Sequence, residues 1–586
     1  MAGQDISDFI SSKSETKSTS YARLPPARQR TLDRGRLRAI LASIVLGLCF
    51  VVFQLNTKTL PRSYILCSPD KKIYTVDPHR NVTDCILVHE KFIMGVGSLH
   101  DVKKTWKQHS NKNIVVRYAK RGSIIIPGMI DSHGHILEHG KKLKLDLDGL
   151  TTPADAVQRI RKYIEERPSL LNDTNIWIHG GGWDNSLWTG WPTAADLESD
   201  PVVRNRPVVL LSKDGHAFWC SKKAILLSSP LPETVEGGII ERDKNGEPIG
   251  TFLDKAMDLI RVPPWTEEQI LEYFNATVTD ALSHGLTGIQ DAALSPALGA
   301  IVERLADENK LPIRLYAMRF FNESEPYWGK SIPKIVGKAD GRLTMRSVKI
   351  FTDGALRSAG AALYEPYTDD PISRGFFRTP SDVLQRIIPR FLEDGWQVNT
   401  HCIGDRANGF FLDLMENLTQ HMDVSSSRPR VEHAQIIAPG DFIRMGKLGV
   451  IASVQPSHVI DDMGFAESRL GPERIKGTYA FRTLIDNHVS IALGTDFPVA
   501  DINPLMTFYA AITRLSIYGD SPHGPSGWFP EQRLTRQEAL KGSLTPGKRA
   551  DYSILSKDIM EIPPQEILRT KVIATVLDGE VVYGKL

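Results

Sequence analysis

Residues 124–136, IIIPGMIDSHGHI, hold the pattern that decides the fold. An apolar run ends at a Pro-Gly pair, and a second short stretch leads through Asp131 to His133 and His135. Side chains at positions i and i+2 of an extended chain project to the same face. Two imidazoles that point the same way at the end of a buried strand can bind one metal ion. The pair alone is a weak signal, so the rest of the chain must supply further ligands.

The composition is that of a folded protein. Of the 586 residues, 41% are hydrophobic and 24% are charged, and the formal net charge is +2, which is typical of globular chains. No dense basic face occurs outside the N-terminal tail, so nothing indicates nucleic-acid binding. The five cysteines include no Cys-x-x-Cys pair, which argues against a thiolate zinc cluster. Cys67 and Cys85 could form a disulfide in an oxidising compartment.

The N-terminal region predicts a membrane anchor. Residues 1–38 are polar, rich in arginine and predicted to be a disordered, basic, cytosolic tail. Residues 39–55, AILASIVLGLCFVVFQL, carry no charge and are predicted to form a transmembrane signal-anchor helix, with a buried core helix or a cleaved signal peptide as the alternatives. The flanking arginines predict a single-pass membrane protein with a cytosolic N-terminus and a lumenal or extracellular catalytic domain. Five Asn-x-Ser/Thr sequons after the span suit a glycoprotein.

The remaining chain alternates short β runs with helical stretches, the pattern of a parallel β/α fold. We predict a first β-sandwich part at 63–126, a barrel at 127–541 with an insertion at about 140–265, and a second sandwich part at 543–586. The fold class expected is therefore α/β: a (β/α)8 TIM-type barrel with a composite β-sandwich built from both chain ends. The Gly-rich stretch GGGWDNSLWTGW is expected to be a loop over a pocket, and a helix at 380–395 is expected to break near Pro389.

One β run after another ends in a side chain that can bind metal or move a proton. These side chains are His133, His135, Lys349, His401, His433, His458 and Asp496. In a (β/α)8 barrel the active site lies at the C-terminal ends of the strands. Each residue alone has a structural alternative: a histidine can be a hydrogen-bonded core residue, Asp496 can cap a turn, and Lys349 can pair with Asp353. Taken together, the ordered set favours a metal site.

Nine stretches resemble one family. They are IIIPGMIDSHGH, GGGWD, VKIFTDGALRS, HCIGDRA, VEHAQ, VIASVQPSH, GTDFPV, AAITR and GSLTPGKRADYSIL. They resemble the amidohydrolase superfamily, and within it the amidohydrolase-three or YtcJ-like branch, which includes N-substituted formamide deformylase. The resemblance implies a metal-dependent hydrolase with zinc, as one or two ions, as the expected cofactor. It also implies a ligand set of His133, His135, Lys349 as a carbamate, His401, His433 and Asp496.

The sequence departs from this family near its end. RQEALKGSLTPGKRAD joins the last barrel helix directly to the second sandwich part, whereas the family carries a helical stretch between them. Part of the closing helix is therefore expected to be missing near residues 541–543, which would weaken the fold.

The expected reaction is hydrolysis of a non-peptide carbon–nitrogen bond, in an N-substituted amide or formamide, by metal-activated water. Asp496 is expected to act as general base and then as general acid. His458 either holds the developing negative charge or packs in the core. The residues expected to contact a small-molecule amide are Trp183, His216, Asp353 and Arg514. The alternative is a catalytically silent, membrane-anchored receptor or scaffold. The sequence determines neither the substrate nor the oligomeric state.

Overall fold

The computed structural model describes residues 60–586 except for 78, 79, 189 and 541. Leu60–Leu586 form one compact unit. The predicted tail at 1–38 and the predicted anchor at 39–55 lie outside the described residues. Within the described part of the chain, no helix is long and apolar enough to cross a bilayer. This finding contradicts the prediction of a single-pass membrane protein for the described residues. The membrane contact predicted for residues 39–55 stays a prediction, because those residues are not described.

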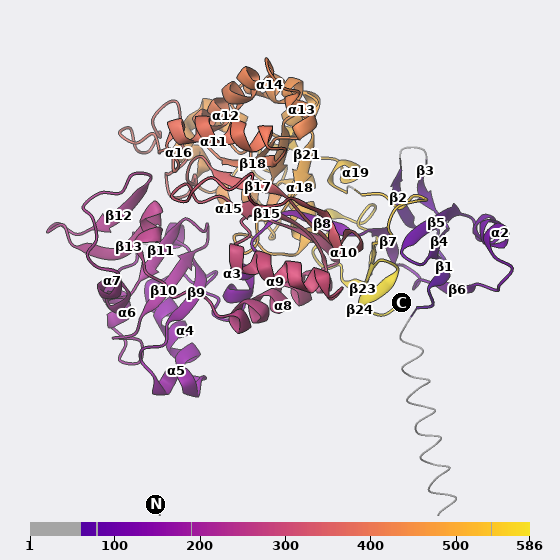
Figure 1. The fold of residues 1–586 in the computed structure, drawn as a ribbon, viewed down its shortest axis with the longest axis horizontal. Helices are drawn as coiled ribbons and strands as arrows, with labels where there is room; N and C mark the ends of the chain where they lie inside the picture. The colour runs from indigo at the N-terminus through magenta and orange to yellow at the C-terminus, as the bar shows by residue number, and fades with distance from the viewer. Residues whose placement is uncertain (1–59, 78–79, 189, 541) are drawn as a thin grey trace, which may run out of the picture. The chain divides into compact units, whose positions relative to one another are not determined.

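Eight parallel strands form a nearly closed barrel, in the sheet order β21-β20-β19-β18-β17-β15-β14-β8 (Figure 1). They are β8 (Met129–Gly134), β14 (Leu286–Asp291), β15 (Arg314–Phe320), β17 (Leu343–Phe351), β18 (Gln397–Cys402), β19 (Arg430–His433), β20 (Ile451–Val454) and β21 (Ile491–Leu493). Most residues of these short runs are buried, as the strands of a parallel sheet covered by helices must be. The predicted parallel β/α barrel is therefore present.

The two end strands, β8 and β21, meet at a seam. The His135 N–H donates to the Phe497 carbonyl and the Asp496 N–H donates to the His133 carbonyl, each at 2.7 Å. The buried carboxylate of Asp131 accepts hydrogen bonds from the N–H and the hydroxyl of Thr495 at 3.0 and 2.7 Å. A Cβ at Gly494 would lie 2.7 Å from the His133 nitrogen, so the close approach of the two strands requires a glycine there.

Helices surround the barrel strands. The principal ones are α3 (Ile136–Lys142), α8 (Glu267–Ser283), α9 (Pro296–Asp307), α11 (Ser381–Glu393), α12 (Asp405–Leu418), α14 (Asp441–Leu448), α15 (Pro456–Asp462), α17 (Phe481–Asp486) and α18 (Pro504–Thr513). Helix α8 begins with a capping box between Thr266 and Gln269, and Phe274 on its apolar face packs in one core cluster with Ile289 of β14. Helix α11 runs through Pro389, so the predicted break is wrong.

The sandwich consists of two sheets. The first has the order β5-β4-β1-β6 and the second β24-β23-β22-β7-β2-β3. Their bounds are β1 (Ser63–Cys67), β2 (Ile73–Asp77), β3 (Arg80–Thr83), β4 (Cys85–His89), β5 (Phe92–Gly97), β6 (Val115–Tyr118), β7 (Ile124–Pro127), β22 (Tyr552–Leu555), β23 (Val572–Leu577) and β24 (Glu580–Gly584). Cys67 and Cys85 form a disulfide between β1 and β4. The second sheet thus joins strands from both ends of the chain.

A separate five-stranded sheet, ordered β12-β13-β11-β10-β9, is inserted between α3 and α8. Its strands are β9 (Ile178–Trp183), β10 (Val208–Ser212), β11 (Ala217–Cys220), β12 (Gly238–Arg242) and β13 (Pro248–Asp254). The Gly-rich stretch at 180–191, expected to be a loop, instead contributes its first four residues to β9. The rest of the stretch holds a short 3-10 turn, Asn185–Leu187, and no strand among its described residues. A Cβ at Gly180 would lie 2.7 Å from the Leu145 side chain, so glycine here permits close packing of a strand and does not signal a loop.

The chain leaves the barrel through a very short helix, α19 (Arg536–Ala539), of four residues. A capping box between Thr535 and Glu538 begins this helix. The Glu538 carboxylate also pairs with the guanidinium of Arg482 on α17 at 2.6 Å. No helix follows α19 in the described residues before the second sandwich part begins. This short connection corresponds to the direct junction between barrel and sandwich in the sequence.

Candidate active site and metal centre

The predicted metal ligands gather at the C-terminal ends of the barrel strands. His133 lies near the end of β8 and His135 is the N-cap of α3. Lys349, His401 and His433 lie near the ends of β17, β18 and β19. His458 lies in α15, directly after β20, and Asp496 follows β21. A (β/α)8 barrel places its active site at this end because the loops that follow each strand converge there.

The Asp496 carboxylate is shared by two histidine pairs. One oxygen lies 3.2 Å from Nε2 of His135 and 3.5 Å from Nε2 of His133. The other lies 3.6 Å from Nε2 of His458 and 3.9 Å from Nδ1 of His433. In each group the three donor atoms lie within 4.8 Å of one another. Two clusters, each able to hold a metal ion, therefore meet at one carboxylate.

Lys349 and His401 complete the buried cluster. The His401 ring lies 4.5 Å from that of His433, and the His433 ring lies 4.8 Å from that of His133, centroid to centroid. Neither Nζ of Lys349 nor either ring nitrogen of His401 has a hydrogen-bond partner among the described residues. Burial lowers the pKa of Lys349 to about 8. The structure thus brings all six predicted ligands, and His458 with them, into one region.

The donor atoms of this region fit a bound cation. Among the described residues, Nε2 of His133, Nε2 of His458 and Oδ1 of Asp496 are also fully buried without a hydrogen-bond partner. Each polar atom that is buried without a partner costs about 1–3 kcal/mol. Several such atoms that point to one region are therefore best explained by a cation that binds there. Imidazole and carboxylate donors suit zinc and similar transition metals.

The electrostatics of the cluster keep three of its imidazoles in the state that binds metal. At His135, burial lowers the pKa, but the hydrogen bond and charge of Asp496 outweigh it and raise that pKa. Burial lowers the pKa of His133 to about 4, with the charge of Lys349 adding to the effect. Burial likewise holds the pKa of His401 and of His433 well below the usual value. These imidazoles are neutral at physiological pH, the state in which a histidine binds metal. Nδ1 of His433 lies 3.1 Å from the side-chain oxygen of Gln455, which favours a proton on Nδ1 and a lone pair on Nε2. Burial alone would raise the pKa of Asp496, but the surrounding imidazoles outweigh it and keep that pKa below its ordinary range.

Sequence reasoning missed Glu432. Its carboxylate lies 2.5 Å from Nδ1 of His133 and is itself held by Arg430 at 2.5 Å and by the side-chain amide of Asn399 at 2.9 Å. Glu432 accepts a hydrogen bond from Nδ1–H of His133. This hydrogen bond fixes the tautomer of His133 and directs its Nε2 toward the cluster. The signal was present: Glu432 stands inside a fully buried strand, where an acid without a partner is costly.

Two site residues have unusual backbone conformations. The φ angle is 74° at His433 and 62° at Asp496, in the left-handed region that side-chain-bearing residues rarely adopt. Alternation along β19 would send His433 to the face opposite Glu432, whereas the structure brings His433 to the same cluster as His133, the partner of Glu432. The strained residues thus lie at the end of β19 and just after β21, where the backbone departs from regular strand geometry and the side chains of His433 and Asp496 point to the site.

A pocket of about 320 Å³ opens beside the cluster. His135, Lys349, His401, His433 and Asp496 line its inner end, and side chains of the insertion, including His216 and Phe218, line its outer part. The His216 ring lies 5.5 Å from that of His401, and its Nδ1 lies 2.6 Å from the Asp254 carboxylate. Of the residues expected to contact substrate, His216 is thus in place to do so.

The other three residues expected to contact substrate do not line this pocket. Trp183 is fully buried in the core of the insertion, where its indole N–H donates to the Leu210 carbonyl. Arg514 is fully buried and donates to the carbonyls of Trp528 and Tyr479. Asp353 accepts hydrogen bonds from the N–H groups of Ala362, Ile403 and Gly404. Trp183 and Arg514 thus make structural contacts, whereas Asp353 also lies 3.7 Å from Nε2 of His401. Substrate contact by these three residues stays a prediction.

Comparisons with known proteins agree with this geometry. The family model described as "Amidohydrolase family" matches residues 121–583. The chain is similar to Protein LONG AFTER FAR-RED 3 of Arabidopsis thaliana (30% identity, 87% of this chain and 90% of the relative). It is also similar to the putative amidohydrolase YtcJ of Bacillus subtilis (29% identity, 88% and 98%) and to N-substituted formamide deformylase of Arthrobacter pascens (24% identity, 88% and 97%).

A solved structure supports the fold. An uncharacterised metal-dependent hydrolase from Pyrococcus horikoshii superposes with a TM-score of 0.68 at 24% identity, over 85% of this chain and 99% of that protein. The family model covers well over half of the chain, and the barrel expected from the resemblance is present. The chain therefore belongs to the amidohydrolase family of metal-dependent hydrolases that act on carbon–nitrogen bonds.

Proposed function

We propose that the protein hydrolyses an N-substituted amide or formamide. The observation that carries this proposal is the convergence of buried, unpaired imidazole and carboxylate donors at the floor of an open pocket. His133, His135 and Asp496 would hold one metal ion, and His433 and His458 with Asp496 would hold a second. Zinc at these positions would polarise the carbonyl and lower the pKa of a bound water.

The residues of the chain divide the remaining tasks. Asp496, whose carboxylate stays ionised, takes the proton of the attacking water and delivers it to the leaving amine. His458 lies 3.6 Å from that carboxylate with an unpaired Nε2, so it can also hold a proton or a developing negative charge near the reacting carbonyl. Glu432 orients His133. The walls of the pocket exclude water from the apolar part of the substrate.

Lys349 has a separate proposed role. A buried ammonium without a partner beside a cation site would oppose metal binding. Converting its amine to a carbamate replaces that positive charge by an anionic oxygen ligand, which suits a site that holds two metal ions. Mass spectrometry of the intact protein at neutral pH with added bicarbonate would show the added carbon dioxide, and Lys349→Arg would lack it.

The test combines metal analysis with a substrate panel. The purified chain, loaded with zinc, is assayed against N-formyl and N-acyl amines, and bound metal is counted in the same preparation. The double variant His133→Ala, His135→Ala should lose metal and hydrolysis together, whereas His523→Ala, at a histidine outside the cluster, should keep both. Metal binding without hydrolysis of any amide would favour a catalytically silent relative. Full metal content in the double variant would contradict the site itself.

A further inference from the structure

The charges around the active-site pocket are unevenly balanced. Two of its lysines have carboxylate partners: Lys142 lies 3.0 Å from Asp148, and Lys213 lies 3.2 Å from Asp148 and 3.7 Å from Asp461. Two further cations that line the pocket, Lys141 and Arg378, form no ion pair within the described residues. Cations that line a pocket and lack a partner are available to a ligand.

Lys141 is partly compensated. It lies on α3, its Nζ sits 5.5 Å from the centre of the Trp265 ring, and only 8% of the residue is exposed. Glu138, three residues earlier on the same helix, lines the same pocket and counteracts the lowering of the Lys141 pKa by burial. These two opposite charges offset each other. Arg378 forms no ion pair within the described residues, although its charge acts on the carboxyl of Asp258, and Lys349 is already assigned to the metal cluster. Arg378 is therefore the cation of this pocket outside the metal cluster that is most available to a ligand.

Arg378 is held close to the metal cluster by its neighbours. Its N–H donates to the carbonyl of Thr352 at 2.7 Å, just beyond the end of β17. Its guanidinium stacks over Phe351, with Cζ 4.3 Å from the ring centre. The Phe351 ring in turn lies 5.1 Å from that of His401. One aromatic ring therefore separates the guanidinium from a predicted metal ligand.

The stacking matters for recognition. A guanidinium that rests with its flat face on an aromatic ring keeps its N–H groups free at its edge, oriented for a bidentate contact with a carboxylate. The pocket also has apolar and aromatic walls at Phe218, Met257 and Trp265. An occupant that matches these features has an amide at one end, an apolar or aromatic body and an anionic group.

The geometry points to Arg378 as the residue that selects substrates carrying a carboxylate, so that the preferred substrate is an N-acylated amine with an anionic group, as in an N-acylated amino acid. This inference rests on the proposed amide hydrolysis and narrows its substrate class. Lys141 adds to the positive field at the same pocket.

The test uses two substrates that differ only in the carboxylate: N-formyl-L-phenylalanine and N-formylphenethylamine. We expect the full-length zinc-loaded protein to favour the acid by about 10- to 100-fold in kcat/KM, the value of one charged hydrogen-bonded contact. In Arg378→Gln this ratio should fall to near one, and Arg378→Lys should keep part of it. The control Arg374→Gln removes an exposed arginine of the same loop, which contacts the Tyr364 carbonyl, and should leave the ratio unchanged.

A binding measurement separates this inference from the proposed hydrolysis. Calorimetric titration of N-formyl-L-phenylalanine into metal-free protein excludes contact between the carboxylate and a metal. There, Arg378→Gln should weaken binding about tenfold or more, whether or not the protein cleaves the ligand. If no amide is hydrolysed but this difference is found, the reaction is wrong and the recognition stands. An unchanged affinity in Arg378→Gln, or a wild-type protein without preference for the acid, would overturn the inference.

Discussion

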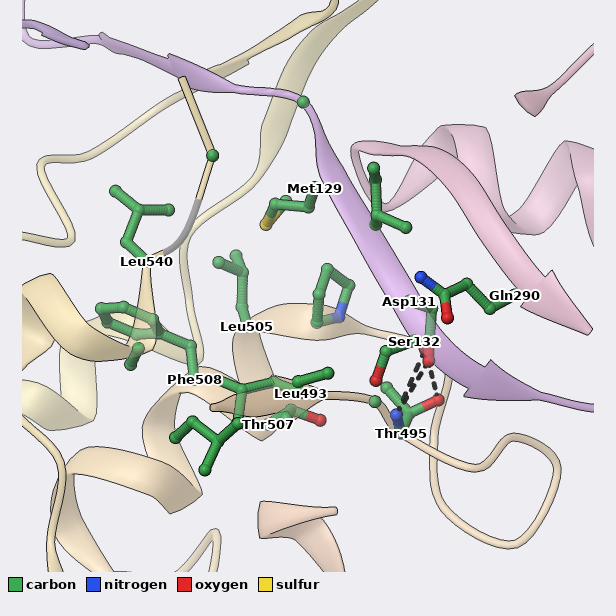
Figure 2. Close-up of a pocket in the computed structure, with 18 of the residues that line it drawn as sticks. Met129, Asp131, Ser132, Gln290, Leu493, Thr495, Leu505, Thr507, Phe508 and Leu540 are labelled. Atoms are coloured by element: carbon green, nitrogen blue, oxygen red, sulfur yellow. Dashed lines mark hydrogen bonds between the residues drawn. The ribbon is translucent and has the colours of Figure 1, made fainter. Parts of the chain in front are cut away.

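Two cavities of nearly equal size lie along the same pair of strands, β8 and β21, and differ in chemistry. The active-site pocket has a volume of about 320 Å³. It is lined by His135, just beyond the end of β8, and by Asp496, beyond the end of β21. The seam cavity, about 330 Å³, lies beside the strands themselves, at residues 128–132 and 491–495. Figure 2 shows Leu505, Phe508 and Leu540 around the seam cavity, with Asp131 bonded to Thr495 at one end.

The difference lies in whether polar groups find partners. In the seam cavity Asp131 is bonded to Thr495, Gln290 accepts from Arg430 and Thr507 bonds to Ser457, with the Ser132 hydroxyl left over. In the active site the donors of His133, His401 and Asp496 remain unpaired. A paired polar group stabilises the fold, whereas a cluster of unpaired ones is costly unless a ligand satisfies it. The polar groups of the first cavity thus mostly have partners within the fold, whereas those beside the second leave donor atoms that a ligand could satisfy.

The largest expected effect is at Asp496. Asp496→Asn keeps the size of the side chain and removes its basicity, so turnover should fall by about 10²- to 10⁴-fold. The acidic limb of the pH–rate profile should disappear with the carboxylate that sets it. Steady-state kinetics across pH, with metal content measured alongside, checks this. Asp486→Asn, at an exposed acid, serves as the control, and near wild-type turnover with an unchanged profile would place the base elsewhere.

The next effect is at Glu432, which acts through His133. Glu432→Gln removes the charge that accepts the Nδ1 proton of His133, and metal affinity should fall by about 10- to 100-fold. Competition with a chelator of known affinity measures this change. The exposed Glu580→Gln should show none. Wild-type affinity in Glu432→Gln would mean that the contact does not orient the ligand.

The seam cavity predicts a gain of stability. Ala492 of β21 lines the cavity, so Ala492→Val should fill part of it and raise the free energy of unfolding by about 0.5–2 kcal/mol. The control is Ala452→Val on the neighbouring strand β20. Ala452 is fully buried in a packed core cluster, where added volume should destabilise by about 1–3 kcal/mol. Denaturant titration compares the two, and equal signs would contradict the distinction between the sites.

The smallest effect concerns an ion pair next to the seam cavity, whose lining includes the adjacent residues Ala539 and Leu540. Hydrogen bonds from Arg482 hold the pKa of Glu538 down to about 2. Because this folded-state pKa is depressed, the pair stabilises the fold above the unfolded-state pKa of about 4.3, and the contribution is lost as pH falls toward 2. Glu538→Gln should therefore lower the free energy of unfolding by less than about 1 kcal/mol at pH near 6. The difference from wild type should shrink at lower pH, and a pH-independent difference would exclude the ion pair as its cause.

Sequence reasoning found the barrel and its ligands because both leave local signals. Apolar runs followed by helical periodicity predict parallel strands, and His133, Lys349, His401, His433 and Asp496 each stand at or just beyond the end of such a run. It was wrong where a local signal has two physical causes. Glycines in β9 permit close strand packing and do not form a loop, and the predicted transmembrane helix finds no counterpart among the helices of the described residues.

The sequence by itself determined which side chains each strand end presents, because alternation and strand termination are properties of a few consecutive residues. Only the tertiary structure decided the partners. Asp496 meets His133 although the two are 363 positions apart in the sequence, and Glu432 also meets His133. Trp183 and Arg514 are buried in the core and do not line the pocket. The physical reason is that the partners and the burial of a side chain depend on which distant segments lie beside it in the closed barrel. A pattern of a few consecutive residues does not encode contacts between distant segments.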